Sequence, residues 1–375
     1  MTKKVLIIER HPDFEIGGVE KYNNLLGKIL NENYKNVKVD KACMYRPQNE
    51  TSPMLDNNTK YYYLKSSYKC NDTQSISDLI AFVLNSFKFK KLIYQLERKN
   101  QYDLIIDCSC IISFPKFYQK NNYLWVQHAS LSAIMIKGFN LKNIFKKVFG
   151  FHNNFLYARN IVLYNEENLK WLLKYRNQNF NYYCINLCCD IPKIDINNLL
   201  ENIKNRKKII YFGRIDNESK NIKLINEINK KINLIDFYGS GDQIWINKLG
   251  TSYKGFLDPS NSPFPLISKY KYMILMSNQE GFSFSLVQAL ACGVPIIVRN
   301  TFINANYLTN NNQNGFLLNN NLTAEEYATQ IKDIYSINEN KYFQLCNNAY
   351  NFACRNLSES EFINKWMDIF NKYLK

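Results

Sequence analysis

Short apolar runs alternate along this chain with segments of helical periodicity. The run KVLIIE at 4–9 precedes a segment whose apolar residues recur at the spacing of one helix face: Val19, Tyr22, Leu26, Ile29 and Leu30. Further apolar runs of strand length lie at 103–108, 123–128, 160–165 and 182–188. After a charged, Asn-rich segment at 195–206, such runs restart at 207–214, 233–241, 271–277 and 294–300. Strands that alternate with helices predict parallel sheets covered by helices on both faces.

The polar break divides this pattern into two halves, and 375 residues exceed what one ordinary core holds. We therefore predict an α/β protein with two Rossmann-like, doubly wound domains, at 1–190 and 191–358. The carboxyl ends of their strands would face each other across a cleft. TAEE at 323–326 predicts a helix capping box. The segment at 359–375 predicts a closing amphipathic helix with one apolar face: Phe362, Ile363, Trp366, Ile369, Phe370 and Tyr373.

Composition adds a strong basic bias. The formal net charge is +16, and residues 1–190 hold 27 Lys and Arg against 16 Asp and Glu. Such a surface favours an anionic partner, for example a lipid head group, a phosphorylated substrate or a nucleic acid. The sequence resembles no recognised nucleic-acid-binding module, so we expect no nucleic-acid partner.

Targeting and metal-binding signals are weak. The apolar run at the start is too short for a signal peptide, and no segment reaches about 18 uninterrupted apolar residues. The ten Cys are scattered without a CxxC pair, and there are only three His. We therefore expect reduced thiols, no zinc site and a cytoplasmic protein.

Glycines follow two of the predicted strands, at points where the backbone can approach a ligand closely. Gly17 and Gly18 open the first helix, whose N-terminus offers N–H groups to a phosphate. Gly239 and Gly241 lie in the turn YGSG. Plain tight turns explain both pairs equally well. Neither segment is a GxGxxG or Walker sequence, so nicotinamide dinucleotide binding and ATP hydrolysis are not indicated.

Charged and titratable residues lie at other strand ends. Arg214 and Lys220, in FGRIDNESK, would suit a diphosphate whose leaving-group charge must be neutralised. A solvated pair of loop cations is the competing interpretation. His128 ends the apolar run 123–128 and would face the cleft. A lone His is more often a hydrogen-bonded structural residue.

Glu280 precedes a short helix in the segment EGFSFSLVQALACG. The N–H groups of residues 281–285 would point outward from the start of this helix, towards a phosphate or a sugar. The helix would also carry Gln288 towards the same cleft. The alternative is a surface Glu before an ordinary core helix.

A basic amphipathic segment lies at 136–150. Its apolar residues follow helical spacing, and three lysines lie off that stripe: Leu141, Ile144, Phe145, Val148 and Phe149, with Lys142, Lys146 and Lys147. Such a helix could lie on an anionic membrane surface. A domain helix with its apolar face in the core remains the competing interpretation.

Taken together, the order of these segments resembles the family 4 glycosyltransferases of the GT-B fold. The second domain of that family carries a Gly-Arg then Lys pair, a Gly-x-Gly turn and a Glu-x7-Glu motif. Here these read FGRIDNESK, YGSG and EGFSFSLVQALACGVPII. GGVEKY at 17–22 resembles the glycine loop of the same family. The resemblance is strong over 207–300 and looser over 1–190, where acceptor sites vary.

The resemblance implies metal-independent transfer from a nucleotide-sugar with retention of configuration, and no cofactor. Arg214 and Lys220 would neutralise the donor diphosphate, which Gly17 and Gly18 would approach from the first domain. Glu280 would bind hydroxyls of the donor sugar. His128 would lie near the anomeric carbon. Further donor contacts are expected at Gly239, Gly241, Gly281, Phe282, Ser283, Phe284, Ser285, Leu286 and Gln288. The helix at 359–375 would brace the first domain.

Gln288 departs from the family pattern, which has a second Glu that grips the ribose. A carboxylate accepts two charge-assisted hydrogen bonds, whereas Gln accepts with one oxygen and donates with its nitrogen. We therefore expect a weaker grip on the nucleotide. Ser283 replaces a common Gly, a change that the start of a helix tolerates.

The sequence thus predicts a retaining glycosyltransferase that moves a hexose or N-acetylhexosamine from a nucleotide-diphospho-sugar. The expected donor is a UDP-sugar, although no residue excludes GDP-mannose. The expected acceptor is a surface glycan or a lipid-linked sugar, with peripheral contact at the inner membrane face through 136–150. The alternative is a non-catalytic GT-B partner subunit. Gln288 favours that alternative, whereas four retained residues oppose it: Glu280, Arg214, Lys220 and His128.

Overall fold

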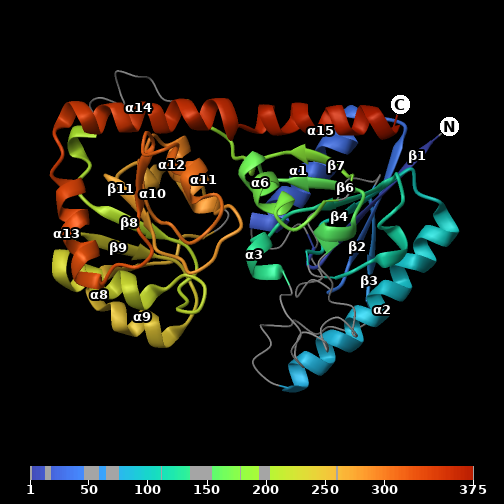
Figure 1. Ribbon diagram of the computed structural model, residues 1–375, viewed down its shortest axis with the longest axis horizontal. Coiled ribbons are helices and arrows are strands. Elements are labelled where there is room, and N and C mark those ends of the chain that lie inside the picture. The colour runs from blue at the N-terminus through green and yellow to red at the C-terminus, as the bar shows by residue number, and fades with distance from the viewer. Residues whose placement is uncertain are drawn as a thin grey trace. The chain divides into compact units, whose positions relative to one another are not determined.

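The chain forms two compact units. The computed structural model describes residues 2–12, 18–45, 59–64, 76–110, 112–135, 154–177, 179–193, 203–258 and 261–374, with side chains in 76–100 described from Ile80 on. Unit 1 comprises Met1–Ile185 and Ile363–Lys375, and unit 2 comprises Asn186–Phe362. Each unit is built around its own sheet (Figure 1). The amphipathic segment predicted at 136–150 and Gly17 lie outside the described residues.

Unit 1 contains a seven-stranded sheet in the order β3-β2-β1-β4-β5-β6-β7, with every pairing parallel. Its strands are β1 (Lys3–Glu9), β2 (Val37–Cys43), β3 (Thr59–Tyr63), β4 (Leu104–Asp107), β5 (Tyr123–Val126), β6 (Asn160–Leu163) and β7 (Asn181–Cys184). Its helices are α1 (Gly18–Asn33), α2 (Ile76–Asn100), the 3₁₀ turn η1 (Pro115–Phe117), α3 (Leu131–Ile134), α5 (Asn154–Tyr157), α6 (Glu166–Leu173) and most of α15 (Glu359–Leu374).

Unit 2 contains a six-stranded sheet in the order β10-β9-β8-β11-β12-β13, again parallel throughout. Its strands are β8 (Ile209–Phe212), β9 (Ile235–Tyr238), β10 (Tyr253–Gly255), β11 (Tyr272–Leu275), β12 (Ile296–Arg299) and β13 (Gly315–Leu318). Its helices are α8 (Ile222–Ile232), α9 (Gln243–Leu249), η2 (Gly250–Ser252), α10 (Phe264–Ile267), α11 (Phe284–Ala291), α12 (Ala305–Thr309), α13 (Ala324–Tyr335) and α14 (Glu339–Asn356). Figure 1 shows α8 and α9 on one face of this sheet and α11 and α12 on the other.

Both sheets have the strand order of a Rossmann fold. In each, the first strand lies between the second and the fourth, so the order of connection reverses between β1 and β4 and between β8 and β11. These findings confirm the predicted α/β class with two Rossmann-like, doubly wound domains. In open parallel sheets, ligands bind beyond the carboxyl ends of the strands at this switch point. The residues that follow β1, β4, β8 and β11 are therefore where functional side chains are expected.

Burial explains why the central strands were recognisable as uninterrupted apolar runs. Val5, Leu6 and Ile7 are fully buried, and Tyr272–Leu275 are at most 2% exposed. Strands of a parallel sheet carry helices on both faces, so they do not alternate with polar residues. The predicted capping box is confirmed, since the Thr323 side chain and the Glu326 side chain each accept from the other's backbone N–H.

The closing helix α15 packs against α1 within unit 1. Trp366 is fully buried, and its indole N–H donates to the Tyr22 hydroxyl over 3.2 Å. Further along, the Tyr34 hydroxyl donates to Asn371 Oδ1 over 3.0 Å, and the Tyr34 ring meets Phe370 edge-on.

None of the described helices is long and apolar enough to cross a bilayer.

Candidate active site

One carboxylate organises the loop that follows β8. Asp216 Oδ2 accepts from Arg214 Nε at 2.7 Å, while Asp216 Oδ1 accepts from the backbone N–H groups of Ser219 and Lys220 at 2.7 and 3.2 Å. Asp216 therefore aims the guanidinium and also fixes the backbone from which the Lys220 side chain starts. The sequence reasoning missed this residue, although it lies inside the quoted segment FGRIDNESK.

The loop that follows β11 places Glu280 against Lys220. Lys220 Nζ forms an ion pair with Glu280 Oε1, and the Ser277 hydroxyl donates to the same oxygen at 2.7 Å. The Lys220 and Glu280 side chains are only 18% and 10% exposed. The Asn278 N–H donates to the Ser219 carbonyl at 2.8 Å, which ties the two loops together. The structure thus places Lys220 and Glu280 in contact at the β8/β11 switch point. Asp216 links Arg214 to the backbone of Lys220 at the same place.

The turn YGSG packs directly against the Arg214 loop. Gly213 N–H donates to the Tyr238 carbonyl, Ile215 N–H to the Ser240 carbonyl and Asp242 N–H to the Ile215 carbonyl. A Cβ added to Gly239 would lie 1.8 Å from the Gly213 carbonyl oxygen, and one on Gly241 would lie 2.2 Å from that of Ile215. Both glycines also have positive φ, of 150° and 152°. Close packing of two loops therefore explains these glycines without any ligand.

Gly239→Ala is expected to lower the free energy of unfolding by at least about 2 kcal/mol, because its Cβ meets backbone that flanks Arg214. Gly250→Ala is the matched control: Gly250 also has positive φ, but a Cβ there meets nothing within 4 Å. The control should lose less, because it carries the backbone strain of a positive φ without a collision of its Cβ. Urea unfolding of both variants measures the difference. Equal losses would contradict the loop-packing interpretation.

Helix α11 begins beside Glu280 with a strained residue. Ser283 has φ 74°, a left-handed value that a Gly would adopt without cost, and its side chain does not cap the helix. The first-turn N–H groups of α11 are therefore not satisfied by this N-cap side chain. Phe282 and Leu286 are at most 1% exposed, so only their backbone can face a ligand. The Asn304 side chain donates to the Gly281 carbonyl and holds the turn in place.

Gln288 lies in the second turn of α11 and is 5% exposed. A side chain this buried would contact a ribose through its terminal amide alone. A Glu at this position would carry its charge with little access to water. Its ionisation would therefore depend more strongly on its hydrogen-bond partners than that of a surface Glu.

In unit 1, His128 lies against the helix that Gly18 opens. His128 follows β5 and is 8% exposed, and its ring meets the ring of Tyr22 edge-on with centroids 4.7 Å apart. Tyr22 lies one turn into α1 and in turn contacts Trp366 of α15. Both imidazole nitrogens are buried and have no hydrogen-bond partner among the described residues. The competing interpretation, in which His128 is a hydrogen-bonded structural residue, therefore finds no support among the described residues.

Burial lowers the pKa of His128 from 6.5 to about 3, so the folded protein keeps the ring neutral. Below pH 6.5 the unfolded chain binds a proton that the folded protein does not. The free energy of unfolding should therefore decrease as the pH is lowered, by about 2 kcal/mol between pH 7 and pH 5. Urea unfolding of the wild type and of His128→Gln at several pH values measures this term. A difference between the two proteins that does not vary with pH would contradict it.

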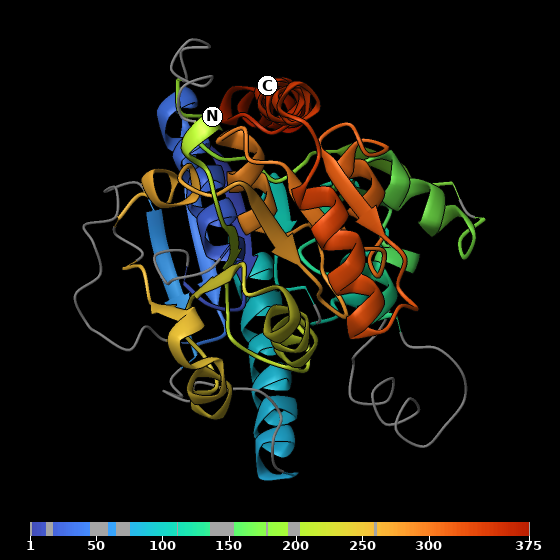
Figure 2. The same cartoon turned by 90° about the vertical axis from the view of Figure 1, so that its left-hand side faces the viewer.

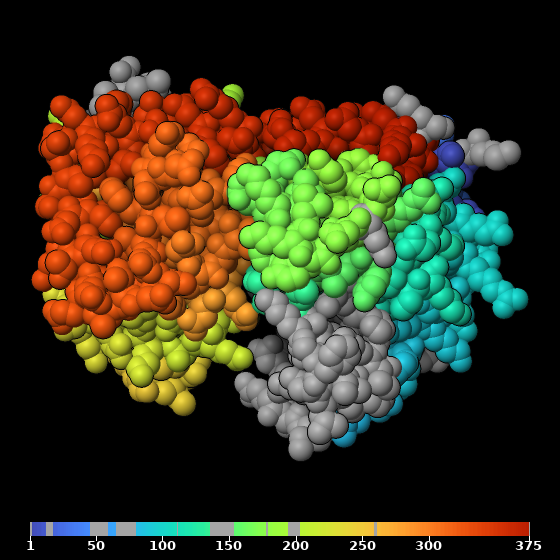
Figure 3. Space-filling model, viewed as in Figure 1, coloured from blue at the N-terminus to red at the C-terminus, as the bar shows by residue number. Residues whose placement is uncertain are grey.

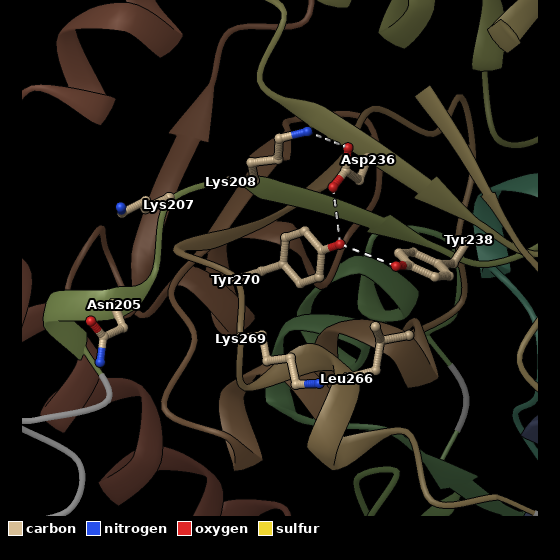
Figure 4. Close-up of a pocket in the computed structure, with 8 residues that line it drawn as sticks. All are labelled: Asn205, Lys207, Lys208, Asp236, Tyr238, Leu266, Lys269 and Tyr270. Carbon is tan, nitrogen blue, oxygen red and sulfur yellow. Dashed lines mark hydrogen bonds and ion pairs between the residues drawn. The ribbon is translucent and has the colours of Figure 1, made fainter. Parts of the chain in front are cut away.

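A separate basic pocket of about 280 Å³ lies away from these residues, lined by Asn205, Lys207, Lys208, Asp236, Tyr238, Leu266, Lys269 and Tyr270 (Figure 4). Lys208 Nζ donates to Asp236 Oδ1 at 2.8 Å, and the Tyr270 hydroxyl donates to Asp236 Oδ2 at 3.1 Å. Lys208 and Tyr270 precede β8 and β11, so the pocket lies near the amino ends of these strands. No predicted site residue lines it.

Part of unit 2 matches the model of a known protein family. A family model described as glycosyl transferases group 1 matches residues 248–352. The matched segment contains Glu280 and all of α11, and it begins after Arg214 and Lys220. No curated protein sequence matches the chain.

Solved structures resemble the fold over nearly the whole chain. A sucrose-phosphate synthase from Thermosynechococcus elongatus has a TM-score of 0.73 at 15% identity and covers 99% of this chain and 98% of its own. HepE from Anabaena, in complex with UDP and glucose, has a TM-score of 0.64 at 15% identity and covers 99% and 100%. A TarM variant from S. aureus, in complex with fondaparinux, α-GlcNAc-glycerol and UDP, has a TM-score of 0.64 at 13% identity and covers 98% and 100%. At such identities the likeness establishes the GT-B fold. Together with the family-model match, it supports a glycosyltransferase.

Proposed function

We propose that this protein is a retaining glycosyltransferase that uses a nucleotide-diphospho-sugar as donor. The observation that carries the proposal is the Lys220–Glu280 pair, placed with Arg214 at the switch point of the unit 2 sheet. A cation, a fork-shaped guanidinium and a carboxylate at one sheet edge suit a diphosphate joined to a polyhydroxylated sugar.

In the proposed reaction the bond between the anomeric carbon and the diphosphate oxygen breaks, and negative charge builds on the leaving diphosphate. Arg214, Lys220 and the first-turn N–H groups of α11 stabilise that charge. The acceptor hydroxyl attacks the same face of the sugar, and its proton passes to the departing phosphate oxygen. Glu280 holds hydroxyls of the donor sugar. No protein nucleophile is required.

The ion pair between Lys220 and Glu280 has a role before the donor arrives. With donor absent, each partly buried charge neutralises the other, which limits the cost of keeping both out of water. A diphosphate competes with Glu280 for Lys220, and the sugar hydroxyls then occupy the released carboxylate. Donor binding would thus exchange one ion pair for two sets of ligand contacts.

Within unit 1, His128 and Gly18 have chemistry suited to a sugar and to a phosphate. A buried, neutral imidazole whose nitrogens have no partner in the described part of the chain can accept a hydrogen bond from a sugar hydroxyl, or donate one to it, without carrying charge. Gly18 begins α1, so its backbone lies where a phosphate is favoured by the helix N-terminus.

The proposed donor is a UDP-sugar of a hexose or N-acetylhexosamine, because HepE and TarM are described as complexes with UDP. The proposed acceptor is a hydroxyl of a surface glycan or a lipid-linked sugar. We further propose a cytoplasmic enzyme that acts without a metal ion or cofactor.

Release of nucleoside diphosphate from a panel of UDP- and GDP-sugars tests the function. The purified chain is assayed in the presence of EDTA, with and without a crude glycolipid fraction. We expect release above background with at least one donor, stimulated by an acceptor. No release with any donor would support the alternative of a non-catalytic GT-B partner subunit instead.

A further inference from the structure

The basic pocket of unit 2 takes no part in the proposed donor chemistry. Its volume of about 280 Å³ lies at the lower end of the range for ligand pockets, which suits a ligand with one ring better than a nucleotide-sugar. Lys208 and Tyr270 precede β8 and β11, whereas Lys220 and Glu280 follow these strands. Each strand has four residues and spans roughly 13 Å, so a ligand in the pocket would leave the donor site free.

The two segments that carry the lysines of the pocket are tied to each other. Arg206 is 5% exposed, and its Nε donates at 2.9 Å to the carbonyl of Ser268, the neighbour of Lys269. The Lys271 N–H donates to the Lys208 carbonyl at 2.7 Å. The walls of the pocket are therefore held in place before a ligand arrives, which lowers the entropic cost of binding.

Helix α13 fixes both segments from the side. The Tyr335 hydroxyl, at the end of this helix, donates to the Lys207 carbonyl, and Lys271 Nζ donates to the Tyr335 carbonyl at 2.7 Å. Figure 2 turns unit 2 towards the viewer and shows α13, in orange-red, in front of the sheet. The backbone from which Lys207 extends is thus anchored to a helix as well as to the sheet.

The pocket has a surplus of positive charge. Its lining includes Lys207, Lys208 and Lys269 but one acid, Asp236. The Asp236 side chain is only 9% exposed, and its Oδ1 lies 2.8 Å from Lys208 Nζ and 3.9 Å from Lys254 Nζ. Lys207 and Lys269 are exposed, and neither pairs with a carboxylate in the part of the chain that the structure describes. Two cations therefore remain available to an anionic ligand.

Two tyrosines add a hydrogen-bond donor and an apolar wall. The Tyr270 hydroxyl donates to Asp236 Oδ2 at 3.1 Å, and the Tyr238 hydroxyl lies 3.3 Å from it on the other side (Figure 4). Since the single proton of Tyr270 is directed at Asp236, the proton of Tyr238 is available to Tyr270 or to a ligand. The two rings meet edge-on beside Leu266 and offer an apolar surface to the C–H groups of a sugar.

We propose that this pocket binds a phosphate monoester of a monosaccharide-sized metabolite. Lys207 and Lys269 bind the phosphate as point charges, and the Tyr238 hydroxyl donates to the ligand. The tyrosine rings contact the carbon skeleton, which inorganic phosphate lacks. The inference goes beyond the proposed function and does not rest on it, because such a ligand would bind whether or not the chain transfers a sugar.

Calorimetric titration with glucose 1-phosphate, glucose 6-phosphate and mannose 6-phosphate tests the proposal, with glucose and inorganic phosphate as reference ligands. At least one sugar phosphate should bind about tenfold or more tightly than either reference, and salt should weaken its binding. Lack of binding by all three sugar phosphates, or an equal affinity for inorganic phosphate, would overturn the proposal.

Variants of the lining residues locate the ligand. Lys207→Gln with Lys269→Gln should lower the affinity for the sugar phosphate about tenfold or more, and Tyr238→Phe should lower it about fivefold. The matched control is Lys223→Gln with Lys230→Gln, which removes two exposed cations of α8 outside the pocket. The yellow atoms of α8 and α9 lie at the surface of unit 2 in Figure 3. The control should bind as the wild type does, and equal losses in the control would contradict the assignment.

The donor site is tested separately on the same proteins. Arg214→Ala with Lys220→Ala should keep the affinity for the sugar phosphate, and the Lys207 and Lys269 variant should keep whatever affinity for UDP the wild type has. Loss of sugar-phosphate binding in the Arg214 and Lys220 variant would place this ligand in the donor site and overturn the proposal. A wild type that binds the sugar phosphate but no nucleotide would leave the pocket assigned and refute only the proposed function.

Discussion

Glu280→Gln is expected to lower sugar transfer about a thousandfold while UDP binds as tightly as before, or more tightly. The amide keeps the size of the side chain and can still accept from the Ser277 hydroxyl, but it loses the charge that pairs with Lys220. Lys220 is then released for the diphosphate, whereas the sugar hydroxyls lose their charged acceptor. Sugar transfer is lowered, whereas UDP binding is kept or strengthened. A general loss of structure cannot produce this combination.

The measurement combines initial transfer rates with calorimetric titration of UDP and with thermal unfolding. Glu218→Gln is the matched control, because Glu218 is an exposed acid on the neighbouring loop and lends only its backbone carbonyl to Asn278. That variant should transfer at the wild-type rate. Wild-type turnover by Glu280→Gln would remove Glu280 from the site, and loss of UDP binding would show that the ion pair supports the nucleotide.

Lys220→Ala and Arg214→Ala are each expected to lower kcat/KM about a hundredfold, because each removes a cation that faces the leaving diphosphate. The Lys220 variant should also lose stability, since it leaves Glu280 partly buried without a counter-charge. The effects should be less than additive, because Asp216 binds Arg214 directly and supports the backbone of Lys220.

Two further variants separate charge from geometry. Arg214→Lys keeps the charge but loses the planar fork, so it should recover only part of the lost activity. Lys223→Ala removes an exposed cation at the start of α8, three residues beyond Lys220, and should have no effect on turnover. Steady-state kinetics with UDP-sugar measures all four variants. An Arg214→Ala enzyme with unchanged kcat/KM would place the diphosphate elsewhere.

Most of the strands that the sequence predicted are buried on both faces, whereas β7 was predicted although its residues are exposed or half-buried. β2 was missed because Lys38, Asp40 and Lys41 interrupt its apolar pattern. Lys41 is nevertheless 2% exposed, and its ammonium lies 3.6 Å from a carboxylate oxygen of Glu9, which is itself fully buried. A charge that is neutralised by a partner on the adjacent strand has no signature in local periodicity. β10, with three residues, is too short to form a recognisable run.

The candidate site was proposed from the order of charged residues along the sequence, which gave Arg214, Lys220 and Glu280. The structure brings Lys220 and Glu280 into contact, and their role in donor binding stays a prediction. Asp216 and Ser277 were not found in this way, because their roles arise from hydrogen bonds between loops that follow different strands. The glycines of YGSG were noticed for possible ligand approach, whereas the structure gives a reason in loop packing.

Titration of the purified chain with UDP and with GDP, in EDTA, tests the central claim most directly. We expect at least one of these nucleotides to bind the wild type, and the double variant Arg214→Ala with Lys220→Ala to lose that binding. Lack of binding by both nucleotides, or equal binding to the double variant, would contradict a diphosphate site at the β8/β11 edge of unit 2.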